Sequence, residues 1–421
     1  MRRIAVASSV GHTIELYDFL IYGTAAATVF NRLFFPQNDP LTGLLLAFAT
    51  FGAGFAARPI GGMVIGHFGD RLGRRGMLVL TLVGTGLSTA LIGLLPTYAT
   101  IGAWAPALLV LLRVSQGFFL GGEAGGAVLL VAEHAPPGRR GWYGSWLFLG
   151  SPAGFFLATG LFSLSSAVSG AGFYDWGWRL PFLFSVVLVL VGLYLRLRVP
   201  ESPEFEQARE KAASPLAEVF RTAPRQVLFG TGVNMGFQIF IFLLVAFAVS
   251  YVTTILKLSP SIALNASLMG ATAQIITVPI AGRLADHWGR IPVMLSGAIG
   301  MALLSFPFFW LLDTAQPGAI YLASILGAGI SGFLFGPMAA FYAELFPTRV
   351  RYTGIGVSYQ LGAVLGGGFA PFVATALLKA TGGESWPVSV YLLLGSVITI
   401  VSLLALREGR TTVRESPATV G

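Results

Sequence analysis

Gly66-His-Phe-Gly-Asp-Arg-Leu-Gly-Arg-Arg75 is followed, 216 residues later, by a shortened copy of the same pattern, Gly282-Arg-Leu-Ala-Asp-His-Trp-Gly-Arg290. Glycine, aspartate, glycine and arginine keep the same spacing in both copies. The offset is close to half of the 421-residue chain, so the repeat indicates a duplicated unit. It therefore predicts two parallel halves with a cavity between them.

A second repeated motif follows further along each half. Glu133-His-Ala-Pro136 precedes Arg140, and Glu344-Leu-Phe-Pro347 precedes Arg351 at the same spacing. A basic loop beside a membrane would explain the arginines, but not the matched acidic and glycine positions in two copies. Glycine permits close helix approach and an aspartate is favourable near a helix N-terminus, so we expect gating rather than ligand contact. The expected gating residues are Gly66, Asp70, Arg71, Gly73, Arg74, Glu133, Arg140, Asp286, Arg290, Glu344 and Arg351.

The composition excludes a soluble protein. Hydrophobic residues make up 55% of the chain and charged residues only 10%, whereas about a quarter of the residues in soluble domains are charged. The 54 glycines suit closely packed membrane helices. The absence of cysteine excludes disulfides, thiolate metal ligands and cysteine nucleophiles. We therefore expect an all-α membrane protein with several spans.

The apolar pattern predicts twelve spans, since about 20 apolar residues are needed to cross a bilayer. Their approximate limits are 5–30, 44–67, 77–96, 104–131, 140–168, 179–199, 225–252, 261–284, 291–312, 318–343, 351–378 and 387–406. The predicted organisation is an N-terminal six-helix half (1–199), a cytoplasmic linker (200–224), a C-terminal six-helix half (225–406) and a short cytoplasmic tail (407–421).

The basic residues predict the orientation of the spans. Of the 26 lysines and arginines, 20 lie on the side that holds both termini, four lie on the other side, and two lie within spans. Cytoplasmic segments are enriched in these residues, so both termini are expected to be cytoplasmic. The net charge of +8 therefore reflects topology and does not indicate a nucleic-acid partner.

The 66–75 stretch resembles the signature loop of the major facilitator superfamily. Other segments resemble its metabolite:proton symporter family and extend the resemblance over essentially the whole chain. They are Glu15-Leu-Tyr-Asp-Phe19, Arg58-Pro-Ile-Gly-Gly62, Arg113-Val-Ser-Gln-Gly117, Trp176-Gly-Trp-Arg-Leu-Pro-Phe182, Glu344-Leu-Phe-Pro-Thr-Arg-Val-Arg-Tyr352 and Gly366-Gly-Gly-Phe-Ala-Pro371. Within the family, residues 25–75 most resemble the shikimate transporter branch. The resemblance implies a major facilitator fold of twelve transmembrane helices in two pseudo-symmetric halves, in a prokaryotic inner membrane.

Five ionisable residues lie within predicted spans, all in the N-terminal half: Glu15, Asp18, Arg58, Arg113 and Glu123. Helical periodicity places Glu15 and Asp18 on one face of the first helix, and Arg113 and Glu123 on one face of the fourth. Asp18 and Arg113 are expected near the membrane midplane, and the other three nearer the cytoplasm. Two layers of ion pairs are therefore possible, Asp18 with Arg113 and, below them, Glu15 or Glu123 near Arg58.

These charges have two interpretations. Ionisable groups inside a membrane are costly and usually functional, but buried pairs can also be static salt bridges between helices. Asp18 and Arg113 are similar in position to the acid–arginine pair of proton-coupled sugar porters, which implies proton coupling. The proton-coupling candidates are thus Asp18 with Arg113, and Glu15 and Glu123 as further candidates.

Neutral polar residues in the spans are candidates for substrate contact, or for hydrogen bonds between helices. We expect hydrogen bonds between helices for Asn265 and Gln274. An arginine suits a carboxylate, and buried amides suit hydroxyl groups. The expected substrate-binding residues are Tyr22, Arg58, Arg113, Gln116, Asn234, Gln238, Tyr359 and Gln360.

The leading hypothesis is a proton-coupled symporter that imports a small organic acid by alternating access, with a shikimate-like hydroxy acid favoured. The alternatives are a symporter of the same fold for dicarboxylates, aromatic acids or zwitterionic osmolytes such as proline and betaine, a facilitator or exchanger, and a transport-inactive membrane sensor. No lysine belongs to a Walker A motif and no metal-ligand cluster stands out, so neither an enzyme nor a cofactor is expected. The expected partners are the substrate, protons and the lipid bilayer, without nucleic acid or an obligate protein partner.

Overall fold

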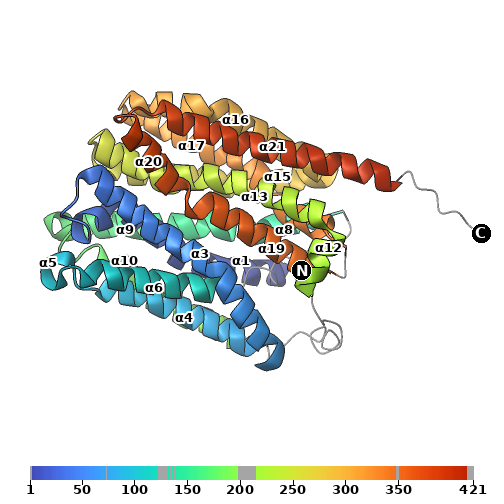
Figure 1. Ribbon diagram of the computed structural model, residues 1–421, viewed down its shortest axis with the longest axis horizontal. Helices are drawn as coiled ribbons and strands as arrows, with labels where there is room; N and C mark the ends of the chain where they lie inside the picture. Colours follow the sequence, from blue (N-terminus) through green and yellow to red (C-terminus); the bar gives the residue numbers. More distant parts are fainter. Residues whose placement is uncertain are drawn as a thin grey trace, which may run out of the picture.

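The computed structural model describes residues 2–72, 74–121, 131, 135–136, 138–197, 215–347 and 350–414, with the side chains of 2–8, 15, 63, 66–72, 74–78, 195–197, 215–217, 352 and 408–414 excepted. Within this part of the chain, every regular element is a helix (Figure 1). Nine helical segments there are long and apolar enough to cross a membrane, and the two shorter helices Val79–Leu94 and Arg179–Tyr194 are also apolar. The first predicted span corresponds to α1 with η1. The predicted all-α class is confirmed.

The helices follow the predicted spans in order. The N-terminal half contains α1 (Arg2–Ala25), η1 (Ala26–Phe30), α2 (Asn31–Leu33), α3 (Pro40–Leu72), α4 (Arg74–Leu94), α5 (Tyr98–Ile101), α6 (Trp104–Gly121), α8 (Arg140–Phe148), α9 (Gly150–Ser169), η2 (Gly170–Phe173) and α10 (Arg179–Leu197). After α12 (Pro215–Thr222), the C-terminal half contains α13 (Pro224–Phe242), η3 (Leu243–Phe247), α14 (Ala248–Ser250), η4 (Tyr251–Ile255), α15 (Pro260–Trp288), α16 (Arg290–Asp313), α17 (Pro317–Phe335), α18 (Met338–Leu345), α19 (Arg351–Gly362), η6 (Ala363–Gly368), α20 (Ala370–Ala380) and α21 (Trp386–Arg414). The exact limits of the two halves stay predictions.

Several spans that the sequence predicts as continuous are interrupted. The segments η1, η3, η4 and η6 are π-helical, and all of them lie in helices that face the other half. The span formed by α17 and α18 breaks at Gly336 and Pro337, because proline lacks the N–H that would continue the hydrogen-bond ladder. A π turn bends a helix locally, so the interface between the halves is built from bent helices.

The predicted loop at 66–75 is largely helical. α3 continues through Asp70 to Leu72, and α4 begins at Arg74. In the second copy of the motif, α15 runs through Asp286 and ends before Gly289, whose φ of 91° is a conformation that favours glycine. The motif therefore marks two helix ends at one end of the bundle, which we call the basic end; its cytoplasmic location remains a prediction.

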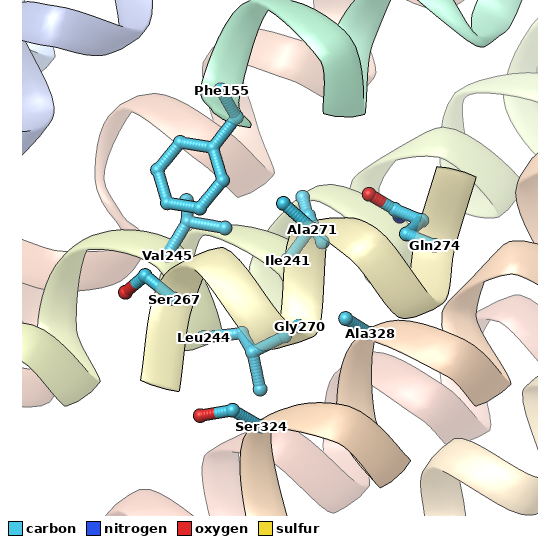
Figure 2. A pocket seen from close by; sticks show the side chains of 10 residues that line it. All are labelled: Phe155, Ile241, Leu244, Val245, Ser267, Gly270, Ala271, Gln274, Ser324 and Ala328. Carbon is cyan, nitrogen blue, oxygen red and sulfur yellow. The ribbon is translucent and has the colours of Figure 1, made fainter. Parts of the chain in front are cut away.

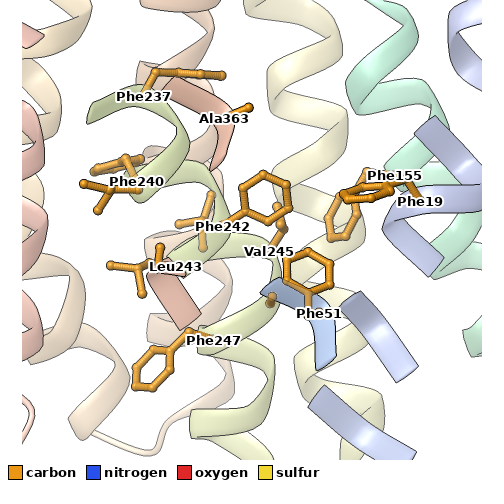
Figure 3. Packing of buried hydrophobic residues seen from close by; sticks show 14 of the residues in the cluster. Phe19, Phe51, Phe155, Phe237, Phe240, Phe242, Leu243, Val245, Phe247 and Ala363 are labelled. Atoms are coloured by element: carbon orange, nitrogen blue, oxygen red, sulfur yellow. The ribbon is translucent and has the colours of Figure 1, made fainter. Parts of the chain in front are cut away.

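The two halves pack against each other along the length of the bundle. Figure 1 shows the N-terminal helices α3, α4, α6 and α10 on one side and the C-terminal helices α15, α16, α17 and α21 on the other. Across the boundary, α15 contacts α8 and α9, and α3 contacts η6 and α20. The ring of Phe51 on α3 lies 5.5 Å from that of Phe242 on α13 (Figure 3). The ring of Phe55, also on α3, lies 5.3 Å from the same ring. An aromatic contact thus fills the centre of the boundary.

Helices α3 and α6 touch through their backbones. A methyl group on Gly117 would overlap the carbonyl of Gly54, one on Gly121 the carbonyl of Arg58, and one on Gly61 the carbonyl of Phe118. Only glycine allows such an approach, and helices that pack this closely share a large area of contact. We refer to these two helices as the glycine-packed pair.

Candidate functional site

Three charged side chains are buried among the helices of the N-terminal half. Arg113 on α6 has 0% of its surface exposed, Asp18 on α1 has 1%, and Arg58 on α3 has 8%. An ionisable group within a membrane costs several kcal/mol and is a functional candidate by default. The predicted burial of these three residues agrees with the structure.

The Arg113 guanidinium lies in an aromatic cage. Its carbon Cζ is 3.9 Å from the centre of the Phe19 ring, 4.3 Å from that of Tyr22 and 4.7 Å from that of Phe51. Its Nη1 donates to the Gln116 side-chain oxygen and, at 3.5 Å, to the Phe19 carbonyl. Aromatic faces attract a desolvated cation, so the cage stabilises a buried positive charge without a carboxylate.

The expected ion pair between Asp18 and Arg113 is wrong for this conformation. Among the described side chains, neither carboxylate oxygen of Asp18 has a hydrogen-bond partner. Gln116 lies between the two residues instead, since its Nε2 donates to the main-chain oxygen of Asp18 and to Thr89 Oγ1, both at 2.7 Å. The Arg113 guanidinium thus contacts Gln116 and the aromatic rings rather than the Asp18 carboxylate. Asp18 and Arg113 nevertheless lie at the same level of the bundle.

The Asp18 carboxyl points toward α4. A methyl group on Gly86 would come within 3.5 Å of Asp18 Oδ2. The Thr89 hydroxyl on the same helix is also close to this carboxyl, but it donates to the main-chain oxygen of Thr85 at 2.9 Å. The carboxyl therefore lies between α1 and α4, and none of the described side chains donates a hydrogen bond to it in this conformation.

Arg58 occupies a second position on the same aromatic cluster. Its Cζ lies 4.7 Å from the ring centre of Phe19 and 5.2 Å from that of Phe55. Its charge also acts on Tyr359 of α19, so this arginine faces the C-terminal half. The predicted partners of Arg58 cannot be compared, because Glu123 and the side chain of Glu15 lie outside the described residues.

The remaining substrate candidates differ in whether their polar atoms have hydrogen-bond partners among the described residues. The Tyr22 hydroxyl lies 2.6 Å from Thr50 Oγ1, and Asn234 Nδ2 donates to the Tyr359 carbonyl at 2.6 Å. In contrast, the amide oxygen and nitrogen of Gln360, which is 9% exposed, have no hydrogen-bond partner among the described residues. Gln238 is buried on α13 beside the π turn η6. Gln360 is therefore the amide in this group most in need of an additional partner.

The two residues predicted to join helices behave differently. Gln274 Nε2 donates to Ser331 Oγ on α17 at 3.0 Å, which confirms its predicted role. Asn265 is exposed on α15, so the same prediction is wrong for it. The difference follows from orientation, because Asn265 lies on the face of α15 that points out of the bundle.

The gating residues form a network at the basic end. Asp286 accepts main-chain N–H bonds from Gly141 and Trp142 at 2.8 Å each, in the first turn of α8. Arg290 pairs with Asp286 at 3.1 Å and with Glu344 at 3.2 Å. The motif aspartate thus does lie at a helix N-terminus, but the helix belongs to the other half. This network joins the halves.

Other predicted gating residues are partly accounted for. Arg351 Nε donates to the Phe346 carbonyl at 3.2 Å, and Arg140 is exposed at the start of α8. Gly73, Glu133 and the side chains of Asp70, Arg71 and Arg74 lie outside the described residues, as does the side-chain environment of Gly66.

The opposite end of the bundle is joined by an exposed contact. Lys379 Nζ on α20 lies 3.6 Å from Asp39 Oδ2, just before α3, and donates to Thr42 Oγ1. Hydrogen bonds from the Thr42 side chain and main chain hold the pKa of the Asp39 carboxyl below its usual range. The two halves therefore contact each other at both ends of the bundle.

A hollow that the sequence did not reveal lies between α9, α13, α15 and α17. It has about 260 Å³ of space, part of it open to the outside, and is lined by Phe155, by Ile241 of α13, by Leu244 and Val245 of η3, and by Ser267, Gln274 and Ser324 (Figure 2). Its polar groups are all neutral. The hollow is therefore separate in chemistry from the arginines of the N-terminal half.

Comparisons with known proteins are consistent across the whole chain. A family model described as Major Facilitator Superfamily matches residues 17–371 and 250–420. The Shikimate transporter of Escherichia coli (strain K12) is 42% identical over 416 residues, covering 97% of this chain and 95% of that protein. An inner membrane metabolite transport protein of the same strain is 42% identical over 417 residues, covering 97% and 94%.

More distant relatives extend the comparison. The Proline/betaine transporter of Escherichia coli (strain K12) is 34% identical over 421 residues, covering 97% of this chain and 84% of that protein. A crystal structure of a D-xylose-proton symporter superposes with a TM-score of 0.75 at 20% identity, covering 96% of both chains. At that identity, the likeness to the symporter concerns the fold alone.

Proposed function

The chain belongs to the major facilitator superfamily, and we propose that within it the protein is a proton-coupled symporter that imports a small organic acid by alternating access. It is a membrane transporter with the predicted major facilitator fold, and it is not an enzyme. We place it in a prokaryotic inner membrane with both termini in the cytoplasm, in keeping with its basic residues and its inner-membrane relative. The observation that carries the proposal is the buried Asp18 carboxyl, which has no hydrogen-bond donor among the described side chains and lies at the same level of the bundle as the caged Arg113.

Asp18 is the proposed proton site. An ionised carboxylate without a hydrogen-bond donor is costly to bury, and a bound proton removes that charge. Arg113 lies at the same level of the bundle, held by Gln116 and three aromatic rings. When the halves rearrange, Arg113 can leave this cage and approach Asp18, which favours the ionised carboxylate and release of the proton. Glu15 and Glu123 stay the reserve candidates.

Arg58 is the proposed anchor for the substrate carboxylate. It faces Tyr359 of the C-terminal half, whereas Arg113 lies deeper and is fully buried. Guanidinium binds a carboxylate through two parallel hydrogen bonds. Neutral donors and acceptors for the hydroxyl groups of the substrate then come from four residues of the C-terminal half: Asn234, Gln238, Tyr359 and Gln360. This combination suits a hydroxylated carboxylic acid. The relative that transports shikimate at 42% identity supports a substrate of that class.

An osmolyte is the main rival substrate, because a Proline/betaine transporter is also related. Aromatic faces recognise quaternary ammonium groups well. Here, however, the faces of Phe19, Tyr22 and Phe51 already carry guanidinium groups. A further cation at this cluster would be repelled, so an anion is favoured over a betaine.

The test is uptake by the purified protein in proteoliposomes. With an imposed pH gradient, acid outside, we expect radiolabelled shikimate to accumulate, and a protonophore to abolish the accumulation. Quinate and benzoate should compete more strongly than proline or betaine. Competition by betaine without competition by organic acids would contradict the substrate class. Binding of shikimate measured by thermal stabilisation, without uptake, would favour the membrane sensor instead.

A further inference from the structure

A chain of hydrogen bonds between neutral side chains leads from Arg113 toward Asp18. Arg113 Nη1 donates to Gln116 Oε1, and Gln116 Nε2 donates to Thr89 Oγ1 at 2.7 Å. Gln116 of α6 and Thr89 of α4 are both 0% exposed. The Thr89 hydroxyl also lies close enough to the Asp18 carboxyl to act on it. Two buried neutral groups thus lie between the caged arginine and the proposed proton site.

The direction of this chain follows from the chemistry of its ends. A guanidinium only donates hydrogen bonds, so the Gln116 atom that faces Arg113 must be the oxygen. The Gln116 nitrogen then donates, both to the main-chain oxygen of Asp18 and to Thr89. Because Thr89 Oγ1 accepts from Gln116, its own hydrogen is left for another acceptor. The chain can therefore continue from Thr89 to a carboxylate, with every bond donated in the direction from the cation to the anion.

Two acceptors compete for the Thr89 hydrogen. In this structure the hydroxyl donates to the main-chain oxygen of Thr85 at 2.9 Å, and neither oxygen of the Asp18 carboxyl receives a bond from a described side chain. A protonated carboxyl has no charge to attract the hydroxyl, so this arrangement suits the protonated form of Asp18. A hydrogen bond to an ionised carboxylate is about twice as strong as one between neutral groups. Loss of the proton should therefore turn the hydroxyl from Thr85 to Asp18.

Ordinary hydrogen bonding within a helix is the alternative role for Thr89. A threonine inside a helix can donate to the main-chain oxygen four residues earlier. Thr375 of α20 illustrates that role, because it is 0% exposed and its only described hydrogen bond is the one to the Pro371 carbonyl, at 2.7 Å. Thr89 differs from Thr375 in accepting from Gln116 and in lying beside a carboxyl. The alternative predicts that the Thr89 hydroxyl has no effect on the protonation of Asp18.

We propose that Thr89 is a positioning residue that supplies the first hydrogen bond to ionised Asp18, at the end of a chain that starts at Arg113 and passes through Gln116. This inference rests on the proposed function. The chain lets the charge of Arg113 favour the ionised carboxylate while the guanidinium is still in its cage, and no proton moves along it. Removal of the Thr89 hydroxyl should therefore make Asp18 hold its proton more tightly.

The charged or titratable side chains described around Asp18 lie on α1, α3 and α6: Tyr17, Tyr22, Arg58 and Arg113. The Tyr17 hydroxyl donates to a main-chain oxygen of α10 at 2.5 Å, so it is directed away from the chain. The side chain of Glu15 lies outside the described residues. On the other side of Asp18, α4 and α10 meet at Gly86 and Val189, which do not titrate, and α9 contains no ionisable residue. Of these charged groups, Arg113 is the one that the chain connects to the carboxyl.

The first test follows the protonation of Asp18 directly and does not depend on shikimate. The infrared absorption of protonated carboxyls is recorded against pH in the purified protein, and the band that Asp18→Asn abolishes is assigned to Asp18. For Thr89→Val and Thr89→Ala we expect the midpoint to rise by about one pH unit, the tenfold change expected when a hydrogen bond to a charged group is lost. Thr89→Ser keeps the hydroxyl and should leave the midpoint unchanged, as should the control Thr375→Val. An unchanged midpoint in both variants that lack the Thr89 hydroxyl would overturn the inference.

A double variant tests whether Thr89 and Gln116 act as one chain. Gln116→Leu removes the link to Arg113, so it should also raise the midpoint of Asp18. Because either substitution interrupts the same chain, Thr89→Val combined with Gln116→Leu should shift the midpoint no further than the larger single shift. Additive shifts would mean that the two residues act on Asp18 separately, which would overturn the chain.

A transport measurement separates this inference from the proposed function. In proteoliposomes with labelled shikimate, the pH of half-maximal uptake should rise by about one unit in Thr89→Val and should stay unchanged in Thr89→Ser and Thr375→Val. An equal rise in Thr375→Val would overturn the inference. If the midpoint of Asp18 shifts as expected but the unchanged protein takes up no shikimate, the proposed function alone is rejected.

Discussion

The two halves share a duplicated fold but differ in what they bury. In the described part of the N-terminal half, Asp18, Arg58 and Arg113 are buried, whereas the polar side chains buried in the described C-terminal half are neutral. Buried charges must be paired, caged or protonated, so they respond strongly to small changes around them. Buried amides and hydroxyls form directed hydrogen bonds at lower cost. The difference supports the proposal that proton coupling depends on the N-terminal half and the recognition of neutral substrate groups on the C-terminal half.

Replacement of Asp18 is expected to have the largest effect. Asp18→Asn removes the proton site but keeps the size, so accumulation under a pH gradient should fall by roughly a hundredfold, the upper range of coupling between two sites. Exchange at equal pH should remain, since it requires no net proton movement. Proteoliposome uptake and exchange assays measure the two activities separately. If Asp18→Asn still accumulates substrate and Glu15→Gln does not, Glu15 is the proton site.

Removal of Arg113 should damage both activities. Arg113→Ala leaves Asp18 without a counter-charge and removes the contacts to Gln116 and the aromatic cage, so we expect losses of about tenfold or more in accumulation and in exchange. Arg113→Lys should recover little, because a lysine does not reproduce the planar guanidinium. Exchange at the unchanged rate in Arg113→Ala would show that Arg113 serves coupling alone.

A substitution at Gly54 tests the geometry of the aromatic cage without removing a charged residue. A methyl group there would lie 2.5 Å from Arg113 Nε, so Gly54→Ala must displace the guanidinium. We expect about a fivefold to tenfold loss of accumulation, comparable to a weakened cation–π contact. Gly160→Ala is the matched control, because its added methyl group would meet only Leu268 at 3.8 Å. Equal losses in both variants would point to general destabilisation of the helices.

The C-terminal half should affect affinity rather than coupling. Gln360→Ala removes an unengaged amide, so the KM for shikimate should rise about fivefold, the value of one hydrogen bond, with the accumulation ratio unchanged at saturation. Gln274→Ala, which removes a bond between α15 and α17, should leave KM nearly unchanged. A lower accumulation ratio in Gln360→Ala would contradict the proposal that the C-terminal half contributes to substrate affinity and not to coupling.

The exposed contact away from the basic end should matter least. The pKa of Asp39 is lowered by its hydrogen bonds, so its contribution is complete at neutral pH and is lost as the pH falls through the lowered pKa. Asp39→Asn should therefore lower the unfolding midpoint slightly at pH 7 and not at all at strongly acidic pH. A large shift at pH 7 would mean that this exposed pair stabilises the closed arrangement more than exposed pairs usually do.

Much of the fold follows from the sequence, because spans depend on local apolar composition. The twelve spans, the burial of Asp18, Arg58 and Arg113, and the common level of Asp18 and Arg113 are all evident from it. The π turns are not, since these segments are almost entirely apolar, so one extra residue in a turn leaves no visible change in the apolar pattern. The contact of Asp286 with α8 also requires knowledge of which helix ends meet in space.

The arrangement around Arg113 shows what a pairwise expectation misses. Opposite charges at one level predict an ion pair, but Gln116 lies three residues after Arg113 on the same helix and reaches the guanidinium first. The contacts of aromatic residues such as Phe19 and Phe51 with the guanidinium were not predicted, because a sequence does not show which ring faces a cation. The motif around Asp18 and Phe19 did contain the signal, an aromatic residue directly beside a buried acid.

The glycine-packed pair constrains how the proposed site around Asp18, Arg58 and Arg113 can change during transport. α3 and α6 touch at Gly54, Arg58 and Phe118 without side chains between them, so they cannot slide past each other without separating. The backbones of Arg58 and Arg113 therefore belong to one rigid body, the pair of α3 and α6. Distances between probes attached to these two helices should stay constant throughout the transport cycle. Any change in the spacing between Asp18 and the arginines must then come from side-chain rotation or from movement of α1.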